Sequence, residues 1–182
     1  YRAPELLEAL DLCLSCKGCS ADCPAGVDMA TYKAEVLHQR YRRRLRPAAH
    51  YALGWLPRWA RLASRAPGLA NAALRAPGLT GLAKRLGGID TRRPLPRFAA
   101  QTFRAWFAAR PRAAAGTPVL LWVDTFTDYF TPEVGRAAVR VLEAAGYAVQ
   151  ITAEPVCCGL TWISTGQLDG ARRQLRRSLR AL

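Results

Sequence analysis

Long apolar runs are missing from this sequence of 182 residues, and no basic-then-apolar segment opens it. Its apolar runs fall well short of the roughly 18 residues that a membrane-spanning helix needs, and no secretory signal peptide is recognisable. We therefore expect a cytoplasmic protein, with any membrane contact peripheral and on the cytoplasmic face. Because the chain opens on Tyr1 and ends inside an amphipathic pattern, we also expect it to be a fragment of a longer polypeptide.

Acidic residues are almost absent from the middle of the chain. Residues 36–116 hold seventeen basic residues and one acid, Asp90, within a total net charge of +14. Such a field attracts anionic surfaces: an acidic partner domain, an acidic lipid surface or, less favoured here, nucleic acid. Six aromatic residues lie among the arginines, and they could equally face a core: Trp55, Trp59, Phe98, Phe103, Trp106 and Phe107.

Four of the six cysteines form one compact motif, in which Cys13, Cys16, Cys19 and Cys23 follow the pattern C-x2-C-x2-C-x3-C-P. Bacterial-type ferredoxins hold 4Fe–4S clusters with this run, and its fourth cysteine ligates the other cluster of a pair. A structural zinc site usually draws two C-x2-C pairs from separate loops, and a disulfide framework needs an oxidising compartment. The motif therefore predicts half of a two-cluster domain, with Gly18 allowing close backbone approach to the cluster.

Helices are predicted on both sides of this motif. The first covers residues 4–14, and the second follows Asp28, which has the character of an N-cap. Large side chains recur at helical spacing in the second helix and are predicted to pack on the cysteine loop: Met29, Tyr32, Val36, Leu37 and Tyr41.

The last third of the chain reads as a βαβ unit with parallel strands. Strands are predicted at 119–123 and 147–151, with a turn over 124–131 and a helix over 132–146 between them. No G-x-G-x-x-G follows the first strand, which argues against a dinucleotide site. A further helix starts near Gln167, with a predicted apolar stripe on one side: Leu168, Ala171, Leu175 and Leu179.

A vicinal pair, Cys157-Cys158, precedes Gly159 just after the second strand. Adjacent cysteines do not readily bond to each other, so the pair indicates metal binding, redox chemistry or plain burial. Ligands and cofactors gather at the carboxyl ends of parallel strands. Beside a ferredoxin-type motif, this position favours a redox role.

Three stretches together resemble the iron–sulfur portion of FAD-linked D-2-hydroxyacid dehydrogenases, a family that includes D-lactate dehydrogenases and the glycolate oxidase iron–sulfur subunit. They are CLSCKGCSADCP, VDMATYKAE and PVCCGLTWISTGQL. The resemblance implies that electrons pass from a flavin through 4Fe–4S clusters toward a quinone or other acceptor. It places FAD in a missing domain or partner, and it implies metal ligation by the four motif cysteines and an iron–sulfur centre at Cys157 and Cys158.

The resemblance also implies an organisation in three parts. Residues 1–46 would form a helical ferredoxin-type segment, 47–116 a basic helical linker and 117–182 the first half of a Cys-Cys-Gly cysteine-rich α/β domain. Two alternatives stay open: an iron–sulfur protein that binds nucleic acid, and thiol–disulfide chemistry at the Cys-Cys-Gly element. The chain offers no base or hydride acceptor for a 2-hydroxyacid, so we expect no substrate turnover by this segment alone.

Overall fold

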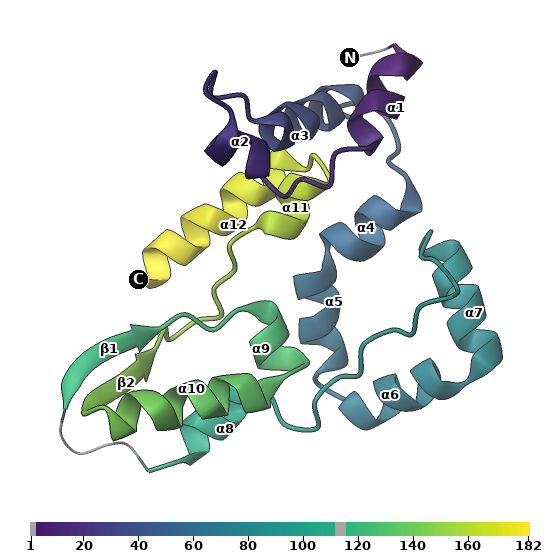
Figure 1. The fold of residues 1–182 in the computed structure, drawn as a ribbon. Helices are drawn as coiled ribbons and strands as arrows, with labels where there is room; N and C mark the ends of the chain where they lie inside the picture. The colour runs from purple at the N-terminus through teal and green to yellow at the C-terminus, as the bar shows by residue number, and fades with distance from the viewer. Residues whose placement is uncertain (1–2, 112–115) are drawn as a thin grey trace. The chain divides into compact units, whose positions relative to one another are not determined.

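The computed structural model describes residues 3–111 and 116–182 and contains, in those residues, twelve helices and one two-stranded parallel sheet (Figure 1). The chain divides into two compact units. The first contains the described residues up to Trp55 together with Gly159–Arg173, and the second contains those of Leu56–Cys158 together with Gln174–Leu182. The predicted combination of a helical part and a small parallel α/β part is confirmed at this level. No described helix is long and apolar enough to cross a membrane.

The first unit consists of short helices: α1 (Pro4–Asp11), α2 (Gly18–Asp22), α3 (Met29–Arg40), α4 (Ala48–Gly54), α11 (Leu160–Ser164) and the start of α12 (Leu168–Ala181). The helix predicted over 4–14 ends at Asp11, and the side chains of Leu12 and Leu14 are exposed. Pro4 stands in the first turn of α1, where its missing N–H costs no hydrogen bond.

Helix α3 begins where the sequence predicts, but it buries a different face. The Asp28 carboxylate accepts a hydrogen bond from the Thr31 N–H at 3.1 Å, which confirms the predicted N-cap. The buried residues are Ala30, Ala34 and Leu37, whereas Met29 and Tyr32 are exposed. The predicted packing face was therefore wrong at those two positions, because α3 buries the side that carries Ala30, Ala34 and Leu37.

Hydrogen bonds distant in sequence connect the two segments of this unit. The Arg46 guanidinium donates to the carbonyls of Thr165 and Gly166, at 2.8 and 2.9 Å. The Gln167 side chain accepts from the indole N–H of Trp55 at 2.7 Å and donates to the His50 carbonyl at 2.8 Å. These bonds satisfy polar groups of the backbone and side chains that packing removes from water.

Gly166 lies close against α3, and this contact gives the first prediction. Its φ of +64° is left-handed, and an added Cβ would lie 2.8 Å from the His38 backbone nitrogen, which cannot move aside cheaply. Gly26 is the matched control, with a φ of +65° and open space around it. We expect Gly26→Ala to cost about 1–2 kcal/mol of unfolding free energy and Gly166→Ala to exceed it by at least about 1 kcal/mol. Equal losses in denaturant unfolding would contradict the close packing.

The second unit contains α5 (Leu56–Ala63), α6 (Pro67–Arg75), α7 (Pro77–Leu86), α8 (Phe103–Ala109), β1 (Thr117–Leu121), α9 (Thr125–Tyr129), α10 (Pro132–Ala144), β2 (Tyr147–Ile151) and the end of α12. The two strands pair in parallel, with Thr117 opposite Tyr147, so the predicted βαβ unit is confirmed. The second strand has the predicted bounds, and the first begins two residues earlier than predicted.

The prediction of a turn over 124–131 was wrong, because this segment contains the short helix α9. Its N-cap is Asp124, whose carboxylate accepts hydrogen bonds from the N–H groups of Phe126 and Thr127 at 2.7 and 2.9 Å. Asp128, in this helix, is buried and accepts the Arg104 N–H at 3.0 Å. Burial raises the pKa of the Asp128 carboxyl, and that hydrogen bond opposes the shift.

The core of the second unit forms around Phe103, whose side chain is 0% exposed, together with Val123, Val139 and Val149. The rings of Trp106 and Phe107 pack against it, so three of the six aromatics in the basic region belong to a core. In α12 the predicted stripe is only partly buried: Ala171 is buried and Leu168 is half-buried, whereas Leu175 and Leu179 are exposed. The predicted buried face of α12 was therefore wrong at Leu175 and Leu179.

Candidate cysteine sites

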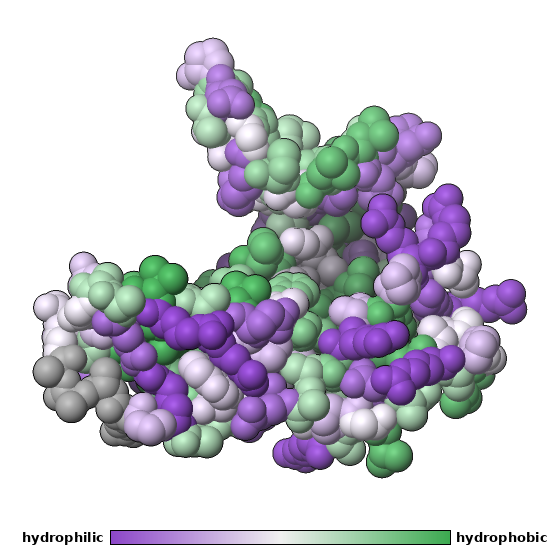
Figure 2. Space-filling view, turned by 60° about the horizontal axis from the view of Figure 1, so that its bottom comes forward, coloured by the Kyte–Doolittle hydropathy of each residue, from purple (hydrophilic) through white to green (hydrophobic). Residues whose placement is uncertain are grey.

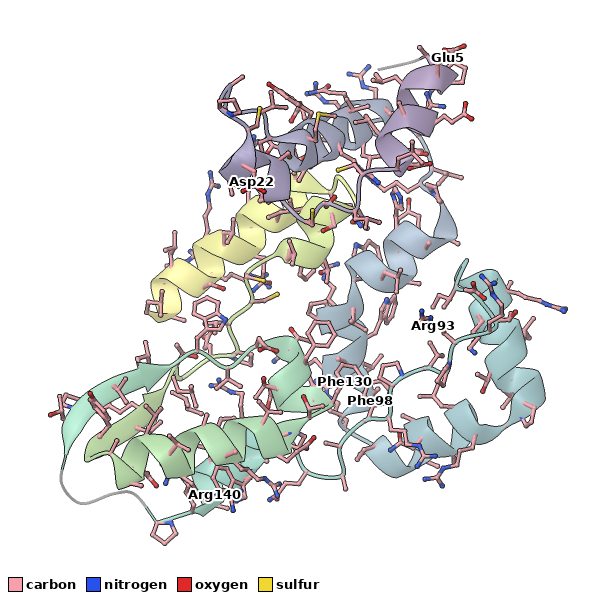
Figure 3. The ribbon with its side chains drawn as sticks, in the orientation of Figure 1. Glu5, Asp22, Arg93, Phe98, Phe130 and Arg140 are labelled. Atoms are coloured by element: carbon pink, nitrogen blue, oxygen red, sulfur yellow. The ribbon has the colours of Figure 1, made fainter. Side chains whose placement is uncertain are left out.

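The four motif cysteines lie on and around α2, between α1 and α3 of the first unit. Figure 3 labels Asp22, the last residue of α2, and draws sulfur atoms in yellow. Cys16 is exposed and the other three are half-buried, and no disulfide joins any of the six cysteines. One short loop therefore presents four reduced thiols within eleven residues.

Two left-handed residues shape this loop. Ser15 and Lys17, on either side of Cys16, have φ values of 57° and 62°. Such a conformation is uncommon outside glycine and costs roughly 1–3 kcal/mol per residue, so the surrounding structure has to enforce it. An added Cβ at Gly18 would meet the Cys16 sulfur at an ordinary 3.7 Å. The left-handed turns of this loop thus fall on Ser15 and Lys17.

Backbone N–H groups point at the cysteine sulfurs. The Ser15 N–H donates to Cys13 Sγ at 3.4 Å, and the Met29 N–H donates to Cys19 Sγ at 3.3 Å. Hydrogen bonds from the backbone of Val27, and of its neighbours Ala25 and Gly26, lower the pKa of the Cys23 thiol. Such donors favour the thiolate, which is the form that ligates metal.

Lysines connect this loop to α3. The Lys17 ammonium lies 2.6 Å from the Asp28 carboxylate, and Lys33 donates to the Cys13 carbonyl at 2.9 Å. Hydrogen bonds from Lys17 and Thr31 lower the pKa of the Asp28 carboxyl to about 2. The carboxylate that caps α3 thus also holds the left-handed Lys17 in place.

The donor set fits an iron–sulfur cluster. Among the described residues, no three or more His, Cys, Asp or Glu side chains converge closely enough to hold a single metal ion. A 4Fe–4S cluster does not require its cysteines to converge on one atom, because each thiolate binds a separate iron at a corner of a cube. Thiols spread along one loop, with N–H donors to sulfur, are suited to binding such a cluster.

The vicinal pair belongs to the second unit. The hydroxyl of Ser178, on α12, accepts the Cys157 N–H at 3.0 Å and donates to the Cys157 carbonyl at 3.0 Å. Cys158 is exposed, and Gly159, with a φ of +76°, is the N-cap of α11. A buried serine thus fixes the backbone of Cys157 while the next thiol faces solvent.

Ser178 was not identified from the sequence. Its signal was present, because it stands seven residues after Ala171 and therefore on the same side of α12. A serine at such a position has to find a hydrogen-bond partner when it is buried. The structure supplies that partner in the Cys157 backbone.

Known iron–sulfur and dehydrogenase proteins resemble this chain. It is 36% identical over 88 residues to an anaerobic glycerol-3-phosphate dehydrogenase subunit of Escherichia coli, covering 47% of this chain and 22% of that protein. It is 27% identical over 157 residues to D-2-hydroxyglutarate dehydrogenase of Pantoea ananatis, and the match covers 79% of this chain and 15% of that protein. It is also 41% identical over 51 residues to an iron–sulfur protein of Methanococcus maripaludis, and the match covers 28% of this chain and 10% of that protein.

The chain spans less than a quarter of the length of each of these relatives. No family model matches it, and no solved structure is significantly similar to it. The relatives confirm the resemblance that the sequence motifs indicated, to the iron–sulfur portion of FAD-linked dehydrogenases.

Proposed function

We propose that this chain, a homologue of the iron–sulfur portions of FAD-linked dehydrogenases, relays electrons between a flavin and a downstream acceptor. The flavin would be FAD in another domain or subunit, and the acceptor a quinone or other electron carrier at the cytoplasmic face of a membrane. The observation that carries the proposal is the C-x2-C-x2-C-x3-C-P loop, with backbone N–H groups directed at its sulfurs.

In this proposal Cys13, Cys16 and Cys19 bind one 4Fe–4S cluster, and Cys23 binds a second one or completes the first. A bound cluster supplies one-electron transfer. The chain's own groups bind and tune it: the thiolates ligate iron, and the N–H groups of Ser15 and Met29 donate to sulfur. Hydrogen bonds to ligating sulfur and exclusion of solvent set the reduction potential. Substrate oxidation would take place in the flavin domain.

The second cysteine site supports a second candidate function. Cys157 and Cys158 would ligate an additional iron–sulfur centre or carry out thiol–disulfide exchange. The observation that favours either role is the anchoring of Cys157 by Ser178 beside an exposed Cys158 thiol. Two thiolates are too few for a cube, so a complete centre there would need ligands from elsewhere. Replacing Cys157 by Ser should abolish exchange activity and leave the cluster at the first site intact.

The test of the relay is metal analysis after anaerobic reconstitution, with low-temperature EPR of the dithionite-reduced protein. We expect about four iron and four sulfide per chain, together with a cubane-type signal. Stoichiometric zinc without sulfide would contradict the proposal. Steeply salt-dependent DNA binding would favour the alternative of an iron–sulfur protein that binds nucleic acid.

A further inference from the structure

The two-stranded sheet of the second unit has an edge at β2 that no described strand covers. β1 pairs with one side of β2 only (Figure 1). The Thr117 N–H donates to the Gly146 carbonyl at 3.2 Å, and Thr117 lies opposite Tyr147. In a parallel ladder this register directs the N–H and C=O groups of Tyr147, Val149 and Ile151 away from β1. Among the described residues these outward groups have no hydrogen-bond partner.

The sequence of β2 does not protect this edge. Residues 147–151 contain no charged side chain, no proline and no glycine. Exposed edges usually carry lysine, proline or a bulge, because unpaired backbone groups otherwise pair with another chain. An unprotected edge is what many peptide-binding domains offer to an incoming strand.

A groove follows this open edge. Its volume is about 750 Å³, and it is lined by consecutive residues 148–153 on one side and by α8 on the other. The described lining residues include none from β1, so the groove lies on the side of β2 that faces away from β1. On α8 the wall contains Ala105 and Ala108, which are exposed and stand three positions apart on one side of the helix. These small side chains leave room for another strand.

Arg104 lies at one end of the groove and gives it a positive charge. Its guanidinium donates to the Thr152 hydroxyl and to the carbonyls of Thr152 and Ala153. These bonds use three of the five N–H donors of a guanidinium, so two donors are left for a carboxylate. Among the described residues that line the groove, Arg104 is the one charged side chain.

The charge of the whole chain favours a negatively charged partner. The sequence has 27 basic and 13 acidic residues. Figure 2 shows hydrophilic residues interspersed with hydrophobic ones on the face that it draws. A second copy of this chain would bring a second net charge of +14 to the interface, and charges of the same sign repel. An acidic segment is therefore a better occupant of the groove than another copy of the chain.

We propose that the edge of β2 binds an acidic peptide segment of a partner protein as a third strand. The backbone of this segment would exchange hydrogen bonds with the outward groups of Tyr147, Val149 and Ile151. Its alternate apolar side chains would face α8, and a carboxylate would bind Arg104. The inference goes beyond the electron relay and needs no cluster.

Fluorescence anisotropy of the whole chain with a synthetic peptide tests this proposal. The probe is a labelled peptide of sequence Glu-Val-Thr-Val-Thr-Val-Glu with blocked ends, which we expect to bind saturably. A peptide with lysine in place of both glutamates should bind at least about threefold more weakly at low salt.

N-methylated forms of the probe test whether its backbone pairs with β2. With the valines facing α8, N-methylation of the valines blocks antiparallel pairing and N-methylation of the threonines blocks parallel pairing. At least one of these two peptides should therefore bind at least about tenfold more weakly than the probe.

Two variants of α8 test whether the groove is the binding site. Ala108→Trp places a large side chain in the groove and should lower the affinity for the probe by at least about tenfold. Ala109→Trp is the matched control, because Ala109 is also exposed on α8 but is not among the residues described as lining the groove. It should bind like wild type. Circular dichroism checks that both variants fold.

Several results would overturn the proposal: no saturable binding by the wild type, equal binding of the lysine peptide, full binding of both N-methylated peptides, or equal affinities of the two tryptophan variants. Dimerisation that Ala108→Trp abolishes, without peptide binding, would assign the edge to a second copy instead. Iron and sulfide are measured on the same samples. A chain that holds a cluster but does not bind the peptide removes this inference alone, and one that binds the peptide but takes up no iron removes the relay alone.

Discussion

Replacing Cys16 by Ser should remove most of the iron and sulfide that the reconstituted protein holds, together with its reduced EPR signal. Cys16 is exposed and sits between two left-handed residues, so its backbone is fixed and its thiol reaches outward from the loop. A serine hydroxyl has almost the same size but does not supply the soft thiolate that iron–sulfur clusters prefer. The measurement is iron and sulfide per chain after anaerobic reconstitution, with EPR on the same samples.

Cys158→Ser is the matched control, since Cys158 is the other exposed cysteine and belongs to the second unit. It should retain the signal of the cluster at the first site. If Cys16→Ser keeps the wild-type iron content, or if both variants lose it equally, assignment of the cluster to the first loop fails. Thermal unfolding of both variants separates loss of ligation from loss of fold.

Truncating Phe103 to Ala should destabilise the second unit by about 3–5 kcal/mol. This ring is completely buried at the start of α8, and it packs on Val123, Val139 and Val149. An added Cβ at Gly135 would also clash with it, which shows how little free space surrounds the ring. The alanine would leave a cavity among these buried valines, and the lost contacts and the cavity both lower stability. Denaturant unfolding followed by circular dichroism measures the change.

Phe126→Ala provides the comparison. Phe126 lies on α9 of the same unit, is 54% exposed and touches Phe130 with ring centroids 6.0 Å apart. Its truncation should cost less than about 1 kcal/mol. Similar losses for the two variants would mean that Phe103 is not the centre of this core.

Local signals predicted most of the secondary structure correctly. Pro132 and Gly146 bracket α10, and the alternation that follows predicted β2 with its observed bounds. Helix α9 was missed because Asp124 has two roles that look alike in a sequence: aspartate favours turns, and it also caps helices. Only the hydrogen bonds from Phe126 and Thr127 distinguish them.

The buried faces were harder to predict. Met29 and Tyr32 recur at helical spacing, but so do Ala30 and Ala34, and periodicity alone does not say which of two neighbouring sides is covered. In the cysteine loop the spacing predicts which side chains would bind a cluster. The left-handed backbone falls on Ser15 and Lys17, which no propensity would select. The prediction of ligation itself still awaits the metal analysis.

Contacts between distant segments left no local signal at all. Nothing near Arg46 indicates that its guanidinium binds carbonyls more than a hundred residues later. Ser178 gave a weak signal, but its partner could not be inferred without the fold. The pairing of Arg46 with Thr165 and Gly166 forms only because the chain returns from the second unit to the first at Gly159.

That return has a consequence for biosynthesis. During synthesis the cysteine loop leaves the ribosome before Thr165, Gly166 and Gln167. These three residues bind Arg46, His50 and Trp55 and follow them by more than a hundred residues. The first segment of this unit therefore lacks these particular hydrogen bonds until residues 56–158 have been translated. Cluster loading onto an unfinished chain would meet a loop whose scaffold is incomplete. Expression of the first 55 residues alone would reproduce that unfinished state permanently.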